Sequence, residues 1–320
     1  MELFDRPLIA FDGSADSEAA LDAVLALRPP DTPGMRLHLV TVVERATLLA
    51  RCAPAGMGIA GISSVVTAAE REARAALERA ADRALDAGVP ADYAVVDGPV
   101  ADELLREARA CGASCIALGT HGRSGVVRAL LGSVSERVVR RSEFPVLSVR
   151  AGRVPQAVGR VLCALDESPA SHEAARIAIG YARRRGAPLT FVTIVAIDDT
   201  IAEGFERDRV DPGGTIAKLY EDAATQLAPF VEEAATYGIE ATTRVAGASD
   251  VANAILAVAA EGGAGLIALG THGRRGLERV VTGSTAERIL RTAVVPVVAV
   301  RDPALRAPSG ATPGHADRRA

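Results

Sequence analysis

Short apolar runs alternate with longer amphipathic stretches along almost the whole chain. Short runs rich in Val, Ile and Leu are typical of strands buried on both faces, and apolar positions three and four apart predict helices. In the first half the predicted strands are Pro7–Phe11, Leu37–Val43, Ala91–Val96, Cys115–Leu118 and Val146–Val149. The predicted helices are Asp16–Leu27, Val65–Ala87, Val100–Ala110 and Val134–Arg141, and the Gly- and Ala-rich stretch Ala46–Ser63 is predicted to be a loop.

The second half repeats this order, with predicted strands at Arg160–Leu165, Pro188–Val195, Ile239–Val245, Leu266–Leu269 and Val297–Val300 and helices at Ala170–Arg185, Thr215–Tyr237, Asp250–Ala260 and Thr285–Arg291. Ile116–Arg150 aligns with Ile267–Arg301 without a gap, and roughly half of the positions are identical, which marks an internal repeat. We therefore predict two tandem domains, 1–150 and 160–301. Each would hold an open, mostly parallel sheet with helices on both faces. The aperiodic tail 302–320 is predicted to be disordered.

One glycine motif stands in both halves, between a predicted strand and a predicted helix. Its spacing is G-x2-G-x9-G-S, formed by Gly119, Gly122, Gly132 and Ser133 in the first copy and by Gly270, Gly273, Gly283 and Ser284 in the second. A strand, a glycine loop and a helix start together present backbone N–H groups to an anion. Glycine is expected there because a Cβ would keep a phosphate from the amides and because a positive φ can be required.

Helix capping is an alternative explanation for the same serines, and it requires no ligand. Ser133-x-x-Glu136 and Ser284-x-x-Glu287 have the pattern of capping boxes. Two intact copies with one fixed spacing favour the phosphate site, because a cap alone does not require the spacing. Asp12 and Asp166 follow the first strand of each half. They are expected at the same sheet edge as the loops, where open α/β sheets bind ligands.

Composition excludes several classes of function. The net charge is −4, aromatic residues make up 3% and Trp is absent, which argues against a nucleic-acid partner. Lys218 is the only lysine and follows no glycine, so a Walker A loop is ruled out. No apolar run is long enough for a bilayer and no basic leader precedes one, so we expect no membrane partner and a cytoplasmic location. The four cysteines lack metal or disulfide spacing and are expected to be small buried hydrophobes.

Other motifs are weaker. Gly56–Gly61 fits GxGxxG, but it does not leave a strand directly and is not repeated, so we interpret it as a surface loop. Asp12–Ser17 is similar to the loop of ATP pyrophosphatases but lacks its first Ser and second Gly, and a turn with a helix cap explains it better. No set of residues resembles an activated nucleophile, and none clusters as metal ligands, so no catalytic or metal residue is predicted.

These residues resemble the universal stress protein family in its tandem form, over nearly the whole chain. The G-x2-G-x9-G-S motif is that family's ATP-binding signature. The resemblance implies two flavodoxin-like or adenine-nucleotide hydrolase-like three-layer domains, each with a five-stranded parallel sheet, related by a pseudo-twofold axis. It implies nucleotide contacts at Asp12, Val42, Leu118, Gly119, Gly122, Gly132, Ser133 and Val134 in the first half and at Asp166, Ile194, Leu269, Gly270, Gly273, Gly283, Ser284 and Thr285 in the second.

The resemblance also implies that Pro145–Val149 and Pro296–Val300 pair within the chain as a pseudo-dimer, with a homodimer left open. The expected ligand is ATP, one per domain, with Mg²⁺ as its companion. The expected role is in stress response or signalling through protein partners, with slow or no hydrolysis. Glu167 in place of Gly13 predicts weaker binding in the second half. A nucleotide-free interaction or dimerisation module and an ATP pyrophosphatase-like enzyme stay open as alternatives.

Overall fold

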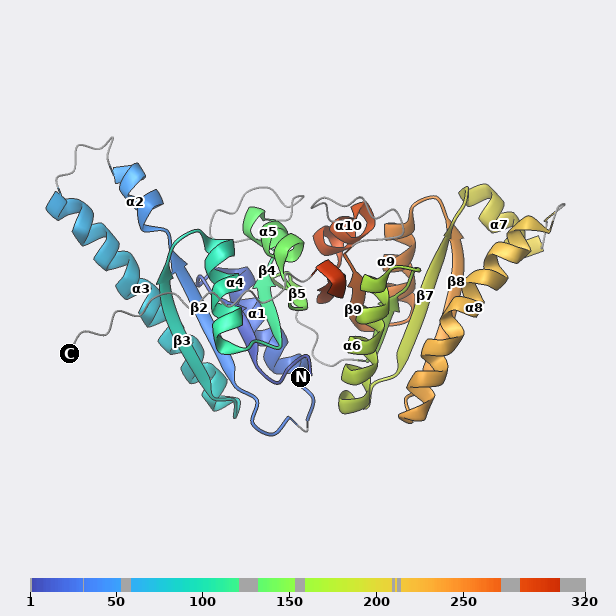
Figure 1. The fold of residues 1–320 in the computed structure, drawn as a ribbon, viewed down its shortest axis with the longest axis horizontal. Coiled ribbons are helices and arrows are strands. Elements are labelled where there is room, and N and C mark those ends of the chain that lie inside the picture. The colour runs from blue at the N-terminus through green and yellow to red at the C-terminus, as the bar shows by residue number, and fades with distance from the viewer. Residues whose placement is uncertain are drawn as a thin grey trace.

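The computed structural model describes residues 2–30, 32–52, 59–120, 132–152, 159–208, 211, 214–271 and 283–305 (Figure 1). The first half contains β1 (Pro7–Ala10), α1 (Ala15–Leu27), β2 (Leu37–Val43), α2 (Arg45–Cys52), α3 (Ile59–Asp86), β3 (Ala91–Asp97), α4 (Val100–Cys111), β4 (Cys115–Gly119), α5 (Ser133–Arg141) and β5 (Val146–Val149). The second half contains β6 (Arg160–Ala164), α6 (Pro169–Arg185), β7 (Leu189–Ala196), α7 (Asp199–Asp208), α8 (Thr215–Thr236), β8 (Ala241–Ala248), α9 (Val251–Glu261), β9 (Ala264–Gly270), α10 (Ser284–Thr292) and β10 (Val297–Val300).

All strands belong to one 10-stranded sheet with the order β3-β2-β1-β4-β5-β10-β9-β6-β7-β8. Pairing is parallel within each half, as predicted, and antiparallel only between β5 and β10. At that junction Val298 lies opposite Leu147. The two last strands therefore pair within one chain, and each half contributes five strands to a continuous sheet.

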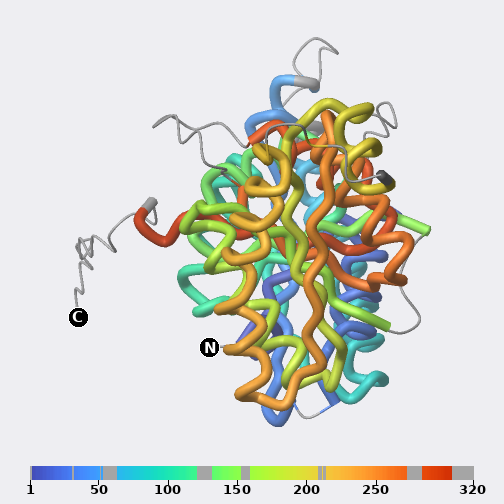
Figure 2. The backbone as a smooth tube through the Cα atoms, turned by 90° about the vertical axis from the view of Figure 1, so that its right-hand side faces the viewer, coloured from blue at the N-terminus to red at the C-terminus, as the bar shows by residue number. Residues whose placement is uncertain are grey.

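Helices cover both faces of the sheet, which gives two cores. Along β4, Cys115 and Ala117 pack into the core beneath α1, α3, α6 and α8. The alternate residues Ile116 and Leu118 pack into the core beneath α4, α5, α9 and α10. Successive side chains of a strand point to opposite faces, so a strand between two helical layers must be apolar at every position. The fold class expected from the sequence is confirmed, and Figure 2 shows it from the side of the second half.

The four cysteines are free thiols in two settings. Cys115 and Cys163 are fully buried strand residues, as expected. Burial raises the pKa of the Cys115 thiol to about 12 and raises the pKa of the Cys163 thiol as well. Cys52 and Cys111 are only half-buried, so for these two the expectation of burial holds only in part.

Two helices lie where the sequence pattern did not predict them. The predicted loop Ala46–Ser63 is wrong over its described part, because it contains α2 and the first residues of α3. Gly61, from the predicted surface loop, lies inside α3, whereas residues 53–58 lie outside the described residues. Arg45 at the start of α2 forms an ion pair with Glu70 of α3. Such tertiary contacts stabilise a short helix whose own propensity is weak.

Helix α7, which the sequence analysis missed, is also held by long-range contacts. The rings of Phe205 in α7 and Tyr220 in α8 lie 4.8 Å apart. Beyond β10, Pro303–Leu305 forms a short 3₁₀-helix within the tail that was predicted to be disordered. The remainder of that tail lies outside the described residues.

Side chains of α6, in the second half, form hydrogen bonds and a ring contact with the first half. The Tyr181 hydroxyl donates a 2.8 Å hydrogen bond to the carbonyl of Leu27, the last residue of α1. Its ring packs 5.6 Å from that of Phe4. Arg185 Nη1 donates to the Arg28 carbonyl at 2.9 Å. Helix-terminal carbonyls have no partner within their own helix, so these donors satisfy groups that burial would otherwise leave unpaired.

Gly119 and Gly270 end β4 and β9 in close contact with the helix that follows the first strand of each half. A Cβ on Gly119 would lie 2.5 Å from the Cβ of Asp16, and one on Gly270 would lie 2.6 Å from the amide nitrogen of Ser171. Neither glycine has a positive φ. Close packing on α1 and α6 therefore suffices to explain glycine at these two positions, and a left-handed conformation is not the reason.

The hydroxyl of Tyr181 should contribute measurably to stability. Replacing Tyr181, which is 2% exposed, by Phe leaves the Leu27 carbonyl without this donor and should lower the free energy of unfolding by about 1 kcal/mol. Tyr237→Phe is the matched control, because Tyr237 is 49% exposed. Urea unfolding measures both variants, and equal losses would contradict the role given to the buried hydroxyl.

Two Gly→Ala changes in the second half should have opposite effects. Gly270→Ala forces a methyl group into the backbone of α6 and should cost about 1–3 kcal/mol of stability. Gly204→Ala lies within α7 with open space around its Cβ and should gain up to about 1 kcal/mol from helix propensity. Thermal unfolding distinguishes them. An unchanged or raised midpoint for Gly270→Ala would disprove the packing explanation.

Candidate functional site

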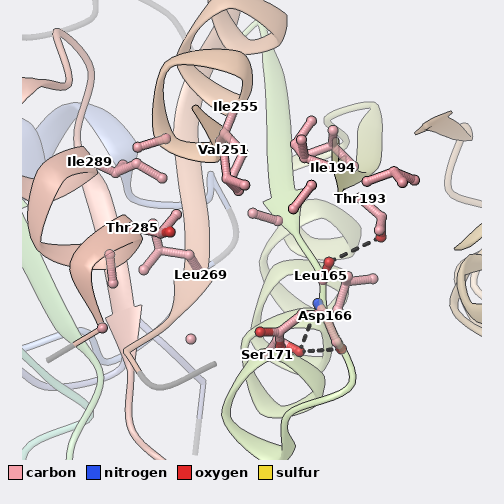
Figure 3. A pocket seen from close by; sticks show the side chains of 18 of the residues that line it. Leu165, Asp166, Ser171, Thr193, Ile194, Val251, Ile255, Leu269, Thr285 and Ile289 are labelled. Carbon is pink, nitrogen blue, oxygen red and sulfur yellow. Dashed lines mark hydrogen bonds between the residues drawn. The ribbon is translucent and has the colours of Figure 1, made fainter. Parts of the chain in front are cut away.

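A cavity of about 1140 Å³ opens at the carboxyl ends of the strands in the second half (Figure 3). Its walls come from the ends of β6, β7 and β9, the first turns of α9 and α10, and one side of α8. The seven described residues that the sequence analysis named for this half all line it: Asp166, Ile194, Leu269, Gly270, Gly283, Ser284 and Thr285. Gly273 lies outside the described residues. The fold thus brings together residues from four separate segments.

The floor of the cavity carries a fixed carboxylate. Asp166 Oδ1 accepts a 2.9 Å hydrogen bond from the Ser168 amide, and the hydroxyl of Ser171 donates to the Asp166 carbonyl at 2.7 Å. In the first half Asp12 accepts from the Ser14 amide at 2.9 Å in the same way. Ser14 and Ser168 are N-caps of α1 and α6. The turn and helix cap inferred for Asp12–Ser17 are confirmed, and they hold the carboxylate in place.

Apolar side chains form the cavity's walls. Ile194 at the end of β7 and Leu269 at the end of β9 lie on either side of β6 (Figure 3). Val251, Ile255 and Ile289 come from α9 and α10. Apolar walls with a few fixed polar groups are typical of pockets that hold small organic ligands.

The helices after the two loops begin in the same way in both halves. Gly132 and Gly283 are the N-caps, and neither helix has a side-chain cap. The capping boxes suggested by the sequence are therefore wrong, because Ser133 and Ser284 are the first helical residues and are exposed. The amides of a first helical turn have no partner within the helix and carry the positive end of its dipole. Such amides can donate hydrogen bonds to an anion.

A matched hydrogen bond closes each loop at its base. The Gly132 amide donates to the Thr120 carbonyl at 2.8 Å, and the Gly283 amide donates to the Thr271 carbonyl at 2.7 Å. The loop residues between these anchors, which include Gly122, lie outside the described residues. The bond fixes where each loop leaves its strand and where it enters its helix.

The first half places its named residues at the same structural positions. Asp12 follows β1, Val42 lies near the end of β2, and Leu118 and Gly119 end β4. Gly132, Ser133 and Val134 begin α5. The sites of the two halves are thus built from equivalent elements.

Sequence reasoning found Glu167 at the second cavity but missed its polar neighbours Asp222, Gln226, Asp250 and Arg288. Arg288 Nη1 forms a 2.7 Å ion pair with Asp250, and Gln226 Nε2 donates to Glu167 Oε1 at 2.7 Å. Asp222 of α8 also lines the cavity. Arg288 has a counterpart in Arg137 of the repeat, but no local pattern marks its pairing with Asp250 or that of Gln226 with Glu167, so only folding brings these residues to one rim.

Among the described residues, no group of three or more His, Cys, Asp or Glu side chains is placed to hold a metal ion. Within the same residues, no helix combines the length and the apolarity that crossing a bilayer requires.

Comparison with solved structures extends over the whole fold. A universal stress protein from Archaeoglobus fulgidus superposes with a TM-score of 0.69 and 22% identity, covering 93% of this chain and 99% of that one. At that identity the likeness concerns the fold alone. It supports a flavodoxin-like arrangement in each half.

Curated relatives carry the same family name. A universal stress protein of Mycobacterium tuberculosis is 32% identical over 193 residues, which span 59% of this chain and 62% of that relative's length. YxiE of Bacillus subtilis is 33% identical over 152 residues, covering 46% of this chain and all of that protein. A relative from Mycolicibacterium smegmatis is 28% identical over 312 residues, or 92% of this chain and 96% of its own.

The model of the universal stress protein family matches twice, at residues 4–150 and 158–301. The two matches cover both halves of the sheet, and each includes one copy of the glycine motif. The chain therefore belongs to the universal stress protein family, as two tandem domains.

Proposed function

We propose that this chain binds ATP, one molecule in each domain, and acts in stress response or signalling as a protein whose state follows the bound nucleotide. The observation that carries the proposal is the second-domain cavity. It combines apolar walls at strand ends, a fixed carboxylate and the open first turn of α10. Its volume of about 1140 Å³ accommodates a nucleotide, because ligand pockets commonly hold a few hundred to a thousand Å³.

Each part of the cavity suits one part of the nucleotide. The adenine ring would lie between Ile194 and Leu269, and the Asp166 carboxylate would accept from a ribose hydroxyl. The phosphates would lie against the first turn of α10, where amides without helical partners favour negative charge. Mg²⁺ would accompany the triphosphate, held by its oxygens and water. The equivalent positions of the first domain support a second molecule.

The chemistry offered by the described residues favours binding over turnover. Hydrolysis needs a positioned base or an electrophile on the γ-phosphate. Among the carboxylates that line the cavity, Asp166 is engaged in the turn before α6, Glu167 accepts a hydrogen bond from Gln226, and Asp250 pairs with Arg288. We therefore infer slow or no hydrolysis and a cytoplasmic signalling role exerted through protein partners.

Nucleotide release tests the proposal directly. Protein purified from cells is denatured and the supernatant chromatographed, with adenine nucleotide expected at up to two molecules per chain. Calorimetry with ATP and Mg²⁺ should show binding, and replacing both Gly122 and Gly273 by Glu should abolish it through steric and charge conflict with the phosphates. Gly204→Glu in α7 is the control, because its Cβ faces open space. No nucleotide and no binding would leave the interaction-module alternative standing.

The second site should bind more weakly than the first because of Glu167. This carboxylate lines the cavity, whereas Gly13 holds the equivalent place in the first domain. Glu167→Gly should tighten ATP binding at the second site about fivefold, the effect of about 1 kcal/mol of charge repulsion. Glu240→Gln removes an exposed carboxylate outside the cavity lining and should change nothing. Equal affinity before and after Glu167→Gly would refute the explanation.

A further inference from the structure

One buried carboxylate distinguishes the two domains. Asp16 lies in the first turn of α1 and is 9% exposed, and Ala170 occupies the equivalent place in α6. Asp16 Oδ1 accepts a 2.6 Å hydrogen bond from the Ala151 amide, and the Thr120 hydroxyl donates to Asp16 Oδ2 at 3.5 Å. Thr120 anchors the first glycine loop, and Ala151 begins the joint between the domains. A single side chain therefore contacts both segments.

These contacts leave little room for independent movement. Gly119, directly before Thr120, packs so closely on α1 that a Cβ there would lie 2.5 Å from the Cβ of Asp16. The bond to Ala151 is short, whereas the bond to Thr120 is at the outer limit for hydrogen bonding. A ligand that shifts Thr120 toward or away from Asp16 would act on a carboxylate that also accepts the hydrogen bond from the Ala151 amide. The hydrogen bond to Ala151 would therefore change as well.

The neighbouring residue carries the connection into the second domain. Arg150 donates a hydrogen bond from its guanidinium to the carbonyl of Arg291 in the last turn of α10. Arg301 occupies the sequence-equivalent place after β10, and its buried Nε has no hydrogen-bond partner among the described residues. α10 spans nine residues, and Ser284 and Thr285 at its other end line the second cavity. A displacement of its last turn would therefore reach residues that line the cavity.

We propose that the two nucleotide sites are energetically coupled through Asp16 and Arg150, so that occupancy of the first site changes the affinity of the second. This inference rests on the proposed ATP binding. Coupling between sites is reciprocal, so occupancy of the second must change the affinity of the first by the same factor. Only the first domain has this carboxylate contact between its loop and the joint, because Ala170 stands at the equivalent position of the second domain and has no carboxylate.

A mutant cycle followed by calorimetry with ATP and Mg²⁺ tests the coupling. Gly122→Glu disables the first site, and the second-site affinity should then differ from that of the unmodified chain by about fivefold or more. In an Asp16→Ala background, which supplies the residue of the sister domain, the same change should alter second-site affinity by less than about twofold. Gly273→Glu disables the second site, and the ATP affinity of the first site should then change by the same factor.

Further variants separate coupling from damage to the fold. Asp16→Leu keeps the size of the side chain but removes both acceptor oxygens if Asp16→Ala unfolds, and Arg150→Met removes the hydrogen bond to the Arg291 carbonyl. Both should reduce the coupling. Asp22→Ala on the exposed side of α1, where Asp22 pairs with Arg83, is the control and should leave it intact. Two sites that bind ATP independently would overturn the coupling alone, as would coupling that survives Asp16→Ala and Arg150→Met. A chain that binds no ATP at either site would overturn the proposed function and the coupling together.

Discussion

Antiparallel pairing of β5 with β10 is the constraint on which the rest of the molecule depends. Each half alone would end its sheet in an exposed apolar strand, because β5 and β10 are buried at every position. An open edge of that kind invites pairing with another chain. Joining the two edges inside one chain removes both and makes one continuous sheet. The contacts of Tyr181 and Arg185 with the end of α1 reinforce the same junction on one helical layer.

Within each half, the close approach of strand ends to helix starts creates the space for a ligand. Gly119 and Gly270 allow β4 and β9 to touch the first turns of α1 and α6. The chain then leaves the sheet, returns at Gly132 or Gly283 and starts a helix without a side-chain cap. Packing glycines and uncapped amides thus serve different purposes within one motif. The first group shapes the backbone, and the second leaves donors available to an anion.

The two domains share a backbone plan but differ where side chains meet over long distances. Gly13 stands in the first domain where Glu167, hydrogen-bonded to Gln226, stands in the second. Asp16 links the first loop to the joint, and Ala170 cannot. Such differences leave the fold unchanged because they lie at cavity rims and helix starts rather than in the two cores. They are the places where sister sites can acquire different affinities.

The sequence by itself determined the strands, most helices, the tandem repeat and the position of the glycine motif. Strands between two helical layers must be apolar at every residue, so they can be recognised from the local sequence, as in Cys115–Leu118. The tertiary structure alone decided that α2 and α7 form, because packing on neighbouring helices outweighs their weak propensity. It also decided that Gly132, not Ser133, caps α5, and that Asp250 meets Arg288 and Asp16 meets Ala151. Contacts between segments far apart in the chain depend on how the sheet brings those segments together, and no local pattern records that approach.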